Sequence, residues 1–212
     1  MSAASGAYLG TSDFAATVLG ILASSGHRPA LAVTLPDRKQ GRGRKVSPSP
    51  VATAAEELGI EVFKCGDVNL PEARERILAA GGEWASICAF GQLIKEPLLT
   101  DLPMLNVHPS LLPRWRGAAP IERSIMAGDG ETGVCVMRLV AGLDSGPVAM
   151  REATAIGPGE DFGSLSDRLA RIGGERGFVD YDHVNPVGAR IAAEQLLASR
   201  LVPRPPSHGE VL

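Results

Sequence analysis

The chain has 212 residues, a net charge of −3 at pH 7 and 44% hydrophobic residues, of which few are aromatic. This length can bury a full core in one domain, and the slightly acidic balance excludes a global attraction for nucleic acid, so any such binding needs a local basic patch. Residues 1–10 show no basic and apolar leader and no run of 18 apolar residues occurs, so we expect a cytoplasmic protein outside the membrane.

The first half of the chain predicts short strands that alternate with helices. A strand ends at Ala7–Leu9 and is weak, because SAASGAYL is small and polar. Gly10-Thr-Ser-Asp then turns into a helix that Ser12 or Thr11 caps. The elements that follow are a strand at Ala30–Leu35, a helix from Pro50 to Leu58, a strand at Ile60–Lys64 and a helix at Pro71–Ala80.

The second half continues the same alternation and predicts a doubly wound α/β fold. Its elements are strands at Trp84–Phe90 and Met104–His108, a helix at Ala118–Ala127, a late strand pair at Val134–Leu139 and Pro147–Thr154, and a helix at Phe162–Ile172. Strand and helix at this spacing favour a mostly parallel, Rossmann-like sheet in a single domain.

The chain changes character near Gly173, which divides it into two predicted parts. Residues 1–174 form the domain, and residues 175–212 form an atypical tail with one possible helix, Val187–Leu201, and a disordered Pro-rich end, Val202–Leu212. The three cysteines are odd in number and have no C-x-x-C spacing, so they are predicted to be reduced core residues (Cys65, Cys88 and Cys135).

Asn106 and His108 are the first candidate site residues. Side chains alternate across a strand, so the two point to one face, and Pro109 ends the strand after them. In open α/β sheets ligands collect beyond the carboxyl ends of the strands, and Phe90-Gly91-Gln92 follows the neighbouring predicted strand. An Asn-x-His pair alone is also compatible with an ordinary strand end whose polar groups are satisfied.

Asp144 lies in a second candidate segment, VAGLDSG at Val140–Gly146. A carboxylate there can orient His108, favour its charged form or accept a proton. Aspartate near glycine is also a common turn residue, so Asp144 could simply cap its own turn.

Four stretches of the chain resemble the 10-formyltetrahydrofolate-dependent formyltransferases. They are GTSDFA at Gly10–Ala15, PDRKQGRGRKVSPSPV at Pro36–Val51, AFGQLIKEPLL at Ala89–Leu99 and NVHPSLLPRWRGAAP at Asn106–Pro120. The resemblance runs from about Gly10 to about Gly174, and the N-x-H-x-S-L-L-P run is specific to this family. The basic stretch is similar to the branch that formylates methionyl initiator tRNA, whose members usually carry a further C-terminal domain that this chain lacks.

The resemblance implies that Asn106, His108 and Asp144 are catalytic. Formyl transfer is attack of an amine on an amide-like carbon through a tetrahedral oxyanion, which requires hydrogen-bond donors and a group that moves protons. Asn106 suits the oxyanion, and an imidazole ordinarily titrates near working pH. No metal is expected, because the four histidines of the chain lack ligand spacing.

The resemblance also implies a folate site, with 10-formyltetrahydrofolate as the formyl donor. Its residues would be Gly91, Gln92, Leu93 and Ile94 in one loop and Ser110, Leu111, Leu112 and Pro113 in the other. Leu143 could add to the apolar surface that a flat pterin needs. Core packing is the alternative reading for each leucine.

The loop Pro36–Pro50 carries five basic side chains against one acidic side chain, Asp37, and is expected to be free of regular structure. By resemblance it contacts tRNA through its phosphates, with Arg38, Lys39, Arg42, Arg44 and Lys45 as the candidate residues. A solvated charge run is the alternative. Trp115 and Arg116 could join this surface, or Arg114–Gly117 could only shape the site entrance.

These features predict a monomeric formyltransferase that acts on methionyl initiator tRNA and binds neither membrane nor DNA. One alternative is a formyltransferase whose acceptor is an amino sugar nucleotide or glycinamide ribonucleotide, which has no use for a basic loop. The other is a truncated, inactive remnant that binds folate or RNA, which the weak first strand and the tail favour.

Overall fold

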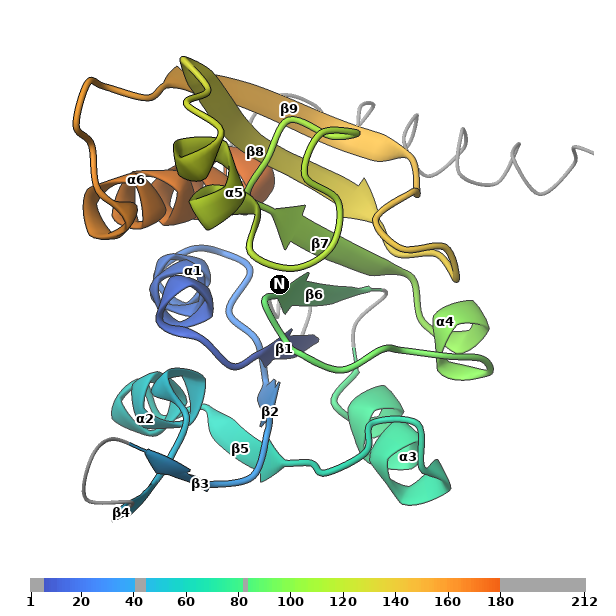
Figure 1. Cartoon of the computed structure of the whole chain (residues 1–212). Coiled ribbons are helices and arrows are strands. Elements are labelled where there is room, and N and C mark those ends of the chain that lie inside the picture. The colour runs from blue at the N-terminus through green and yellow to red at the C-terminus, as the bar shows by residue number, and fades with distance from the viewer. Residues whose placement is uncertain (1–5, 41–44, 82–83, 180–212) are drawn as a thin grey trace, which may run out of the picture.

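The computed structural model describes residues 6–40, 45–81 and 84–179 and shows a seven-stranded sheet between helices (Figure 1). The strand order is β5-β2-β1-β6-β7-β8-β9. The strands are β1 (Ala7–Gly10), β2 (Leu31–Thr34), β5 (Glu61–Lys64), β6 (Ala85–Cys88), β7 (Met104–His108), β8 (Glu131–Arg138) and β9 (Val148–Ala155). The first five are parallel, whereas β8 and β9 are antiparallel to their neighbours, so the predicted α/β fold is confirmed.

Helices cover both faces of the sheet (Figure 1). One face packs against α1 (Asp13–Ala23), α2 (Pro50–Glu57), α5 (Pro120–Met126) and α6 (Phe162–Gly174), and the other against α3 (Pro71–Ala79) and α4 (Leu98–Asp101). Alternation along β1 shows the division, because Tyr8 belongs to the first core cluster whereas Ala7 and Leu9 belong to the second.

The weak strand β1 lies in the middle of the sheet, hydrogen-bonded to β2 on one side and β6 on the other. Its small residues are explained by the packing around them. A Cβ on Gly10 would lie 2.8 Å from the Tyr8 ring and 3.0 Å from the Cys88 carbonyl oxygen. Tyr8 itself is fully buried and donates its hydroxyl to the Ala15 carbonyl at 2.6 Å. Tight packing therefore replaces side-chain bulk in this strand.

Most predicted elements are confirmed within two or three residues at each end. Ser12 is the cap of α1 and accepts from the Ala15 amide, whereas the Thr11 hydroxyl donates to the Phe90 carbonyl at 2.8 Å. Helix α4 was not predicted, because its four residues are too few to show a helical period.

The prediction that the loop Pro36–Pro50 has no regular structure is wrong. β3 (Arg38–Gln40) and β4 (Lys45–Ser47) pair antiparallel as a separate two-stranded sheet. Two three-residue runs on either side of a glycine-containing connection are a hairpin signal, which the high charge of the segment obscured.

Helix α6 continues past Gly174 as a π-helix, η1 (Glu175–Val179). The predicted boundary between the domain and the tail lies between Gly174 and Glu175, where α6 passes into η1. The division into domain and tail stays a prediction. A Cβ on Gly173 would lie 2.7 Å from the Val107 side chain, and one on Gly177 2.7 Å from the Val136 side chain, so these glycines let the helix lie directly on β7 and β8. The predicted helix 187–201 and the Pro-rich end lie outside the described residues.

The three cysteines are free and buried, as predicted. Burial raises the pKa of Cys88 to about 12, so its thiol stays protonated at neutral pH. None of the helices in the described ranges is both long and apolar enough to span a bilayer.

Candidate active site

Strand β7 presents Asn106 and His108 on one face, where β8 lines them with apolar side chains. Asn106 pairs with Met137 and His108 with Cys135. These two β8 residues form a small buried cluster with Leu112. Asn106 is 9% exposed and His108 is 5% exposed. Both polar side chains are therefore largely removed from bulk water. Electrostatic interactions between such buried groups are stronger than the same interactions in water.

Each nitrogen of the His108 ring faces an oxygen atom. Nε2 lies 3.0 Å from the Trp115 carbonyl oxygen, and Nδ1 lies 3.6 Å from Oδ2 of Asp144. A carbonyl oxygen only accepts, so Nε2 must carry a proton to make this hydrogen bond. In the neutral ring Nδ1 then holds the lone pair, and it is the nitrogen that can take up a further proton beside the carboxylate.

Asp144 joins two segments that are distant in the sequence. Its backbone is left-handed, with φ at 40°, and its Oδ2 accepts from the Gly117 amide at 2.7 Å. A residue that only capped its own turn would not reach across 27 residues, so the alternative of a local cap does not describe this contact. Left-handed backbone at a residue other than glycine costs free energy and is found most often at functional sites.

The Asn106 side chain is 9% exposed, and its amide group is not among the fully buried polar groups that lack a partner in the described ranges. Its place on the face that carries His108 leaves its donors available to a ligand.

The segment 109–119 is held by its own polar contacts. The Ser110 hydroxyl donates to the Arg114 carbonyl at 2.6 Å, and the Arg114 guanidinium binds both carboxylate oxygens of Asp129. Trp115 and Ala119 have φ of 59° and 57°. Trp115 thus contacts His108 through its carbonyl and Asp129 through its indole, whereas the Arg116 side chain is exposed.

The sequence interpretation missed three backbone and side-chain partners of the site. They are the Trp115 carbonyl, the Gly117 amide and the Asp129 carboxylate. Backbone groups leave no trace in a residue pattern. Asp129 follows a helix-ending glycine, Gly128, and reads there as an ordinary turn residue.

The first predicted folate loop follows β6, and its four residues lie in different surroundings. Gly91 is exposed with φ at 84°, and Leu93 is 61% exposed. Ile94 is buried in the core cluster under α3 and α4. The Gln92 side chain accepts from the Val68 amide at 2.8 Å and donates to the Cys65 carbonyl at 2.9 Å, so it ties this loop to the one before α3.

The second predicted folate loop follows β7. Ser110 is fully buried and its amide donates to the His108 carbonyl. Leu112 is buried and its carbonyl accepts from Arg151, while Pro113 is exposed. Leu111 is half-buried, with its side chain 2.6 Å from where a Cβ on Gly133 would be. Because β6 and β7 are parallel neighbours, the two loops leave the sheet at the same edge.

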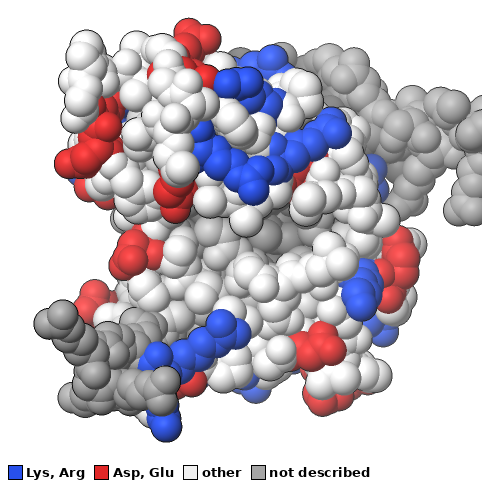
Figure 2. All heavy atoms as spheres, viewed as in Figure 1, with Lys and Arg blue, Asp and Glu red and all other residues white. Residues whose placement is uncertain are grey.

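Figure 2 shows a hollow in this face of the molecule, which in this view lies over β6 and the loop after β7 of Figure 1. Lysine and arginine side chains gather along its upper rim. Leu93 and Leu143, at 61% and 64% exposed, are the exposed apolar residues of the loops after β6 and after β8. Surface leucines of this kind suit an apolar ring better than a polar ligand.

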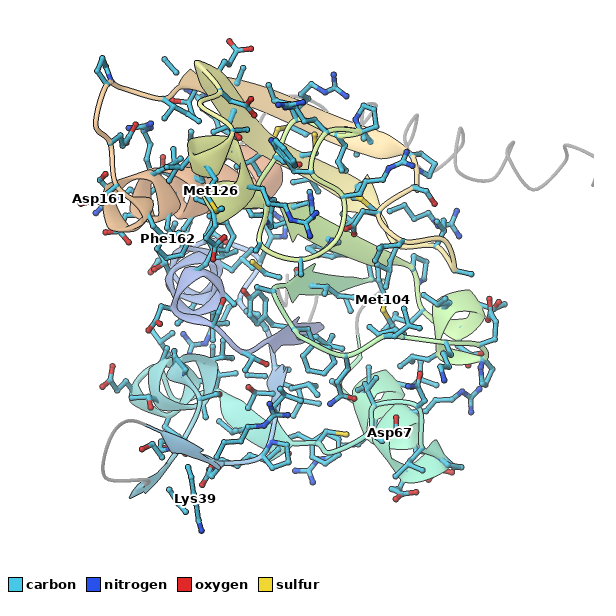
Figure 3. The ribbon with its side chains drawn as sticks, viewed as in Figure 1. Lys39, Asp67, Met104, Met126, Asp161 and Phe162 are labelled. Atoms are coloured by element: carbon cyan, nitrogen blue, oxygen red, sulfur yellow. The ribbon has the colours of Figure 1, made fainter. Side chains whose placement is uncertain are left out.

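The predicted RNA-binding residues lie on the separate hairpin. Arg38 and Lys39 are exposed on β3, and Figure 3 shows Lys39 pointing away from the body of the molecule. Lys45 begins β4, while Arg42 and Arg44 lie outside the described residues. Asp37 beside the hairpin pairs with Lys64 at 2.7 Å, so the acidic residue of the segment is already neutralised.

Over the described ranges, no cluster of three or more His, Cys, Asp or Glu side chains has the geometry to hold a metal ion.

The chain is similar to known proteins over most of its described length. A family model described as formyl transferase matches residues 7–180. The chain is 46% identical over 170 residues to a methionyl-tRNA formyltransferase of Methylococcus capsulatus and 47% identical over 169 residues to one of Cereibacter sphaeroides. These matches cover 79% and 78% of this chain but 55% of each relative, so the chain spans about half their length.

Solved structures show the same fold. A glycinamide ribonucleotide transformylase from Geobacillus kaustophilus superposes with a TM-score of 0.65 at 24% identity, covering 81% of this chain and 93% of that one. A sugar N-formyltransferase from a Shewanella species superposes with a TM-score of 0.59 at 13% identity, covering 83% of this chain and 68% of that one. At these identities the likeness concerns the fold alone.

Proposed function

The chain belongs to the formyl transferase family, and we propose that it moves a formyl group from 10-formyltetrahydrofolate to the amino group of methionyl initiator tRNA. The observation that carries the proposal is the contact between His108 and Asp144, at 3.6 Å, on the strand that also carries the Asn106 side chain. The sequence identity of 46–47% to enzymes with this name supports it, although they are about twice as long.

Each catalytic role follows from the position of the group. The Asn106 amide donates to the oxygen of the formyl group as negative charge develops there, which is worth about 3–4 kcal/mol for one such donor. Nδ1 of His108 takes a proton from the attacking amine, because Nε2 is already committed to the Trp115 carbonyl. Asp144 then stabilises the imidazolium that results.

The bonds made and broken balance without a metal or redox partner. The amine nitrogen forms a bond to the formyl carbon, and the bond from that carbon to the folate nitrogen breaks. His108 takes the proton that the amine loses and gives it to the folate nitrogen as that nitrogen leaves, so the imidazole ends in its starting state. Burial of His108 and Asn106 limits competing attack by water.

The folate donor fits between the two loops that leave β6 and β7. Its pterin needs backbone donors and acceptors along one edge and apolar contact on its faces. Gly91, which is exposed, would supply backbone groups in the first loop, and the exposed Leu93 would supply apolar contact. Ile94 and Leu112 are core residues that shape the loops from beneath.

The hairpin favours tRNA over a small acceptor. Arg38 and Lys39 are exposed, and Asp37 beside them is paired with Lys64. A basic hairpin of this kind can follow a phosphate backbone, whereas glycinamide ribonucleotide or an amino sugar nucleotide offers one or two phosphates at most. We place the reaction in the cytoplasm, in keeping with the free buried cysteines, and we expect the chain to act as a monomer.

A direct assay tests the proposal. The full chain is incubated with 10-formyltetrahydrofolate and methionyl initiator tRNA, and formyl-methionine is released from the tRNA and measured. We expect product in proportion to enzyme. The His108→Ala variant serves as the matched control, because it keeps the strand and removes the imidazole. Absence of product from the wild type, with folded protein and active substrates, would refute the proposal.

The same assay separates the alternatives. Formylation of glycinamide ribonucleotide or an amino sugar nucleotide in place of the tRNA would assign a small acceptor. Binding of folate or tRNA without turnover would assign the inactive remnant. We expect turnover with the tRNA and none with the two small acceptors.

A further inference from the structure

Asp129 connects the end of α5 to the segment that carries the site. It follows Gly128, and its amide donates to the Ser124 carbonyl at 3.0 Å, which fixes it to the helix. Helix α5 is itself anchored by Ile121 in the core. The Asp129 side chain is 15% exposed. Its carboxylate is therefore part of the framework and not of a mobile surface.

Three donors from two consecutive residues converge on this carboxylate. Arg114 donates from Nε to Oδ2 at 2.8 Å and from Nη2 to Oδ1 at 2.6 Å, and the Trp115 indole donates to Oδ2 at 2.7 Å. The guanidinium also lies 4.3 Å from the Trp115 ring centre. These contacts hold the pKa of Asp129 below its usual range, with the Arg114 hydrogen bonds as the larger cause. The carboxylate is thus charged at neutral pH.

The clamp fixes a residue whose backbone would not hold its conformation alone. Trp115 has φ at 59°, a left-handed value that costs a bulky residue on the order of 1–3 kcal/mol. With the indole bound to Asp129, the orientation of the Trp115 peptide is set. Its carbonyl oxygen then lies 3.0 Å from Nε2 of His108.

We propose that Asp129 is a positioning residue: by binding the Trp115 indole it holds the Trp115 carbonyl against His108 and so decides which ring nitrogen carries the proton. Without that carbonyl, part of the neutral imidazole population would carry its single proton on Nδ1 instead of Nε2, because Asp144 is the acceptor next to Nδ1. In those molecules Nδ1, which is proposed to take the proton from the amine, would already be protonated. The inference rests on the proposed function only for its effect on rate.

The first measurement is the tautomer of His108, which does not depend on turnover. Histidine is labelled with nitrogen-15, and the ring signals are recorded at a pH where the ring is neutral. The His108 signals are identified by their loss in His108→Ala. We expect the Nε2-protonated form to dominate in the wild type and to lose population in Asp129→Ala, which removes the acceptor of the indole, and in Trp115→Phe, which keeps an aromatic side chain but has no N–H donor.

The second measurement is the split between kcat and KM. We expect kcat to fall roughly 10- to 100-fold in both variants while KM for each substrate changes by less than about threefold, because misplacing a catalytic group affects the chemical step most. The double variant should lose no more than the worse single variant. Asp167→Asn, an exposed charge change on α6, is the matched control and should leave both parameters unchanged.

Thermal unfolding accompanies both measurements, so that loss of folded protein is distinguished from loss of positioning. If Asp129→Ala fails to fold, Trp115→Phe, which keeps the Arg114–Asp129 pair, carries the test. A wild-type tautomer population and a wild-type kcat in folded Trp115→Phe would overturn the inference. A shifted tautomer in a protein that lacks formyl transfer would support the positioning role and refute only the proposed function.

Discussion

The segment 109–119 and the β3–β4 hairpin are both basic excursions from the sheet, but the chain holds them in opposite ways. In the first, Arg114 is bound by Asp129, and Trp115 and Gly117 are bound to His108, Asp129 and Asp144. In the second, Arg38 and Lys39 are exposed and lie in a sheet of two strands. The Arg114 charge is thus neutralised by Asp129, whereas the charges of Arg38 and Lys39 are left to solvent.

The largest effect on the rate is expected from a substitution at His108. We expect His108→Ala to reduce formyl transfer by at least about 10³-fold, because both proton transfer and the partner of Asp144 are lost. The melting temperature should change little, since the side chain faces the site rather than the core. Single-turnover rates and thermal unfolding measure the two effects. Turnover at the wild-type rate would remove His108 from the mechanism.

Substitutions at Asp144 should have the next largest effect on the rate. Two variants separate the contribution of its charge from that of its hydrogen bond. Asp144→Asn keeps an oxygen for the Gly117 amide and loses the charge beside His108. We expect kcat to fall about 100-fold in Asp144→Asn and further in Asp144→Ala, which loses both interactions. Equal rates in the two variants would show that the contact with Gly117 contributes nothing to the rate.

The hairpin should respond in a different parameter. Arg38→Gln with Lys39→Gln is expected to raise KM for tRNA several-fold, leave kcat unchanged, and lower the slope of log KM against log salt by about one for each cation that contacts a phosphate. Arg123→Gln with Arg171→Gln, on the helices α5 and α6, is the matched control. A salt slope equal to that of the wild type would exclude the RNA role of β3.

The smallest effect concerns acid stability and the clamp at Asp129. Its pKa is lowered in the folded chain relative to an ordinary carboxyl near 3.9, so its contribution to stability is complete above that value and disappears as the pH falls through the lowered pKa. Asp129→Asn should therefore destabilise the protein at pH 7 and match the wild type at strongly acidic pH. Chemical denaturation at a series of pH values measures the difference. A gap between the two proteins that stayed constant with pH would contradict this assignment.

Much of this architecture could be predicted from the chain because its signals are local. Pro50 and Pro71 open helices, and apolar runs mark β6 and β7. The bounds of β7 were predicted to the residue, since Pro109 ends the strand directly after His108. The mostly parallel arrangement of the strands could be predicted because strands alternate with helices along the chain.

The failures share a physical reason, which is that the deciding partner is distant or is a backbone group. Strand β1 looked weak because its neighbours supply the packing. Nothing in the residues around Asp144 indicates that it accepts from the Gly117 amide. The Asp129 clamp depends on α5 ending where it does, and the hairpin on pairing between two runs dominated by charge.

Strand β7 has hydrogen-bonded neighbours on both edges, β6 and β8, and helices α6 and α4 on its two faces. Its amide protons can therefore exchange with deuterium only when the whole sheet opens, whereas the hairpin, in a sheet of its own, can open alone. Mild destabilisation elsewhere should lower the number of competent molecules in solution and leave the turnover of each surviving molecule unchanged.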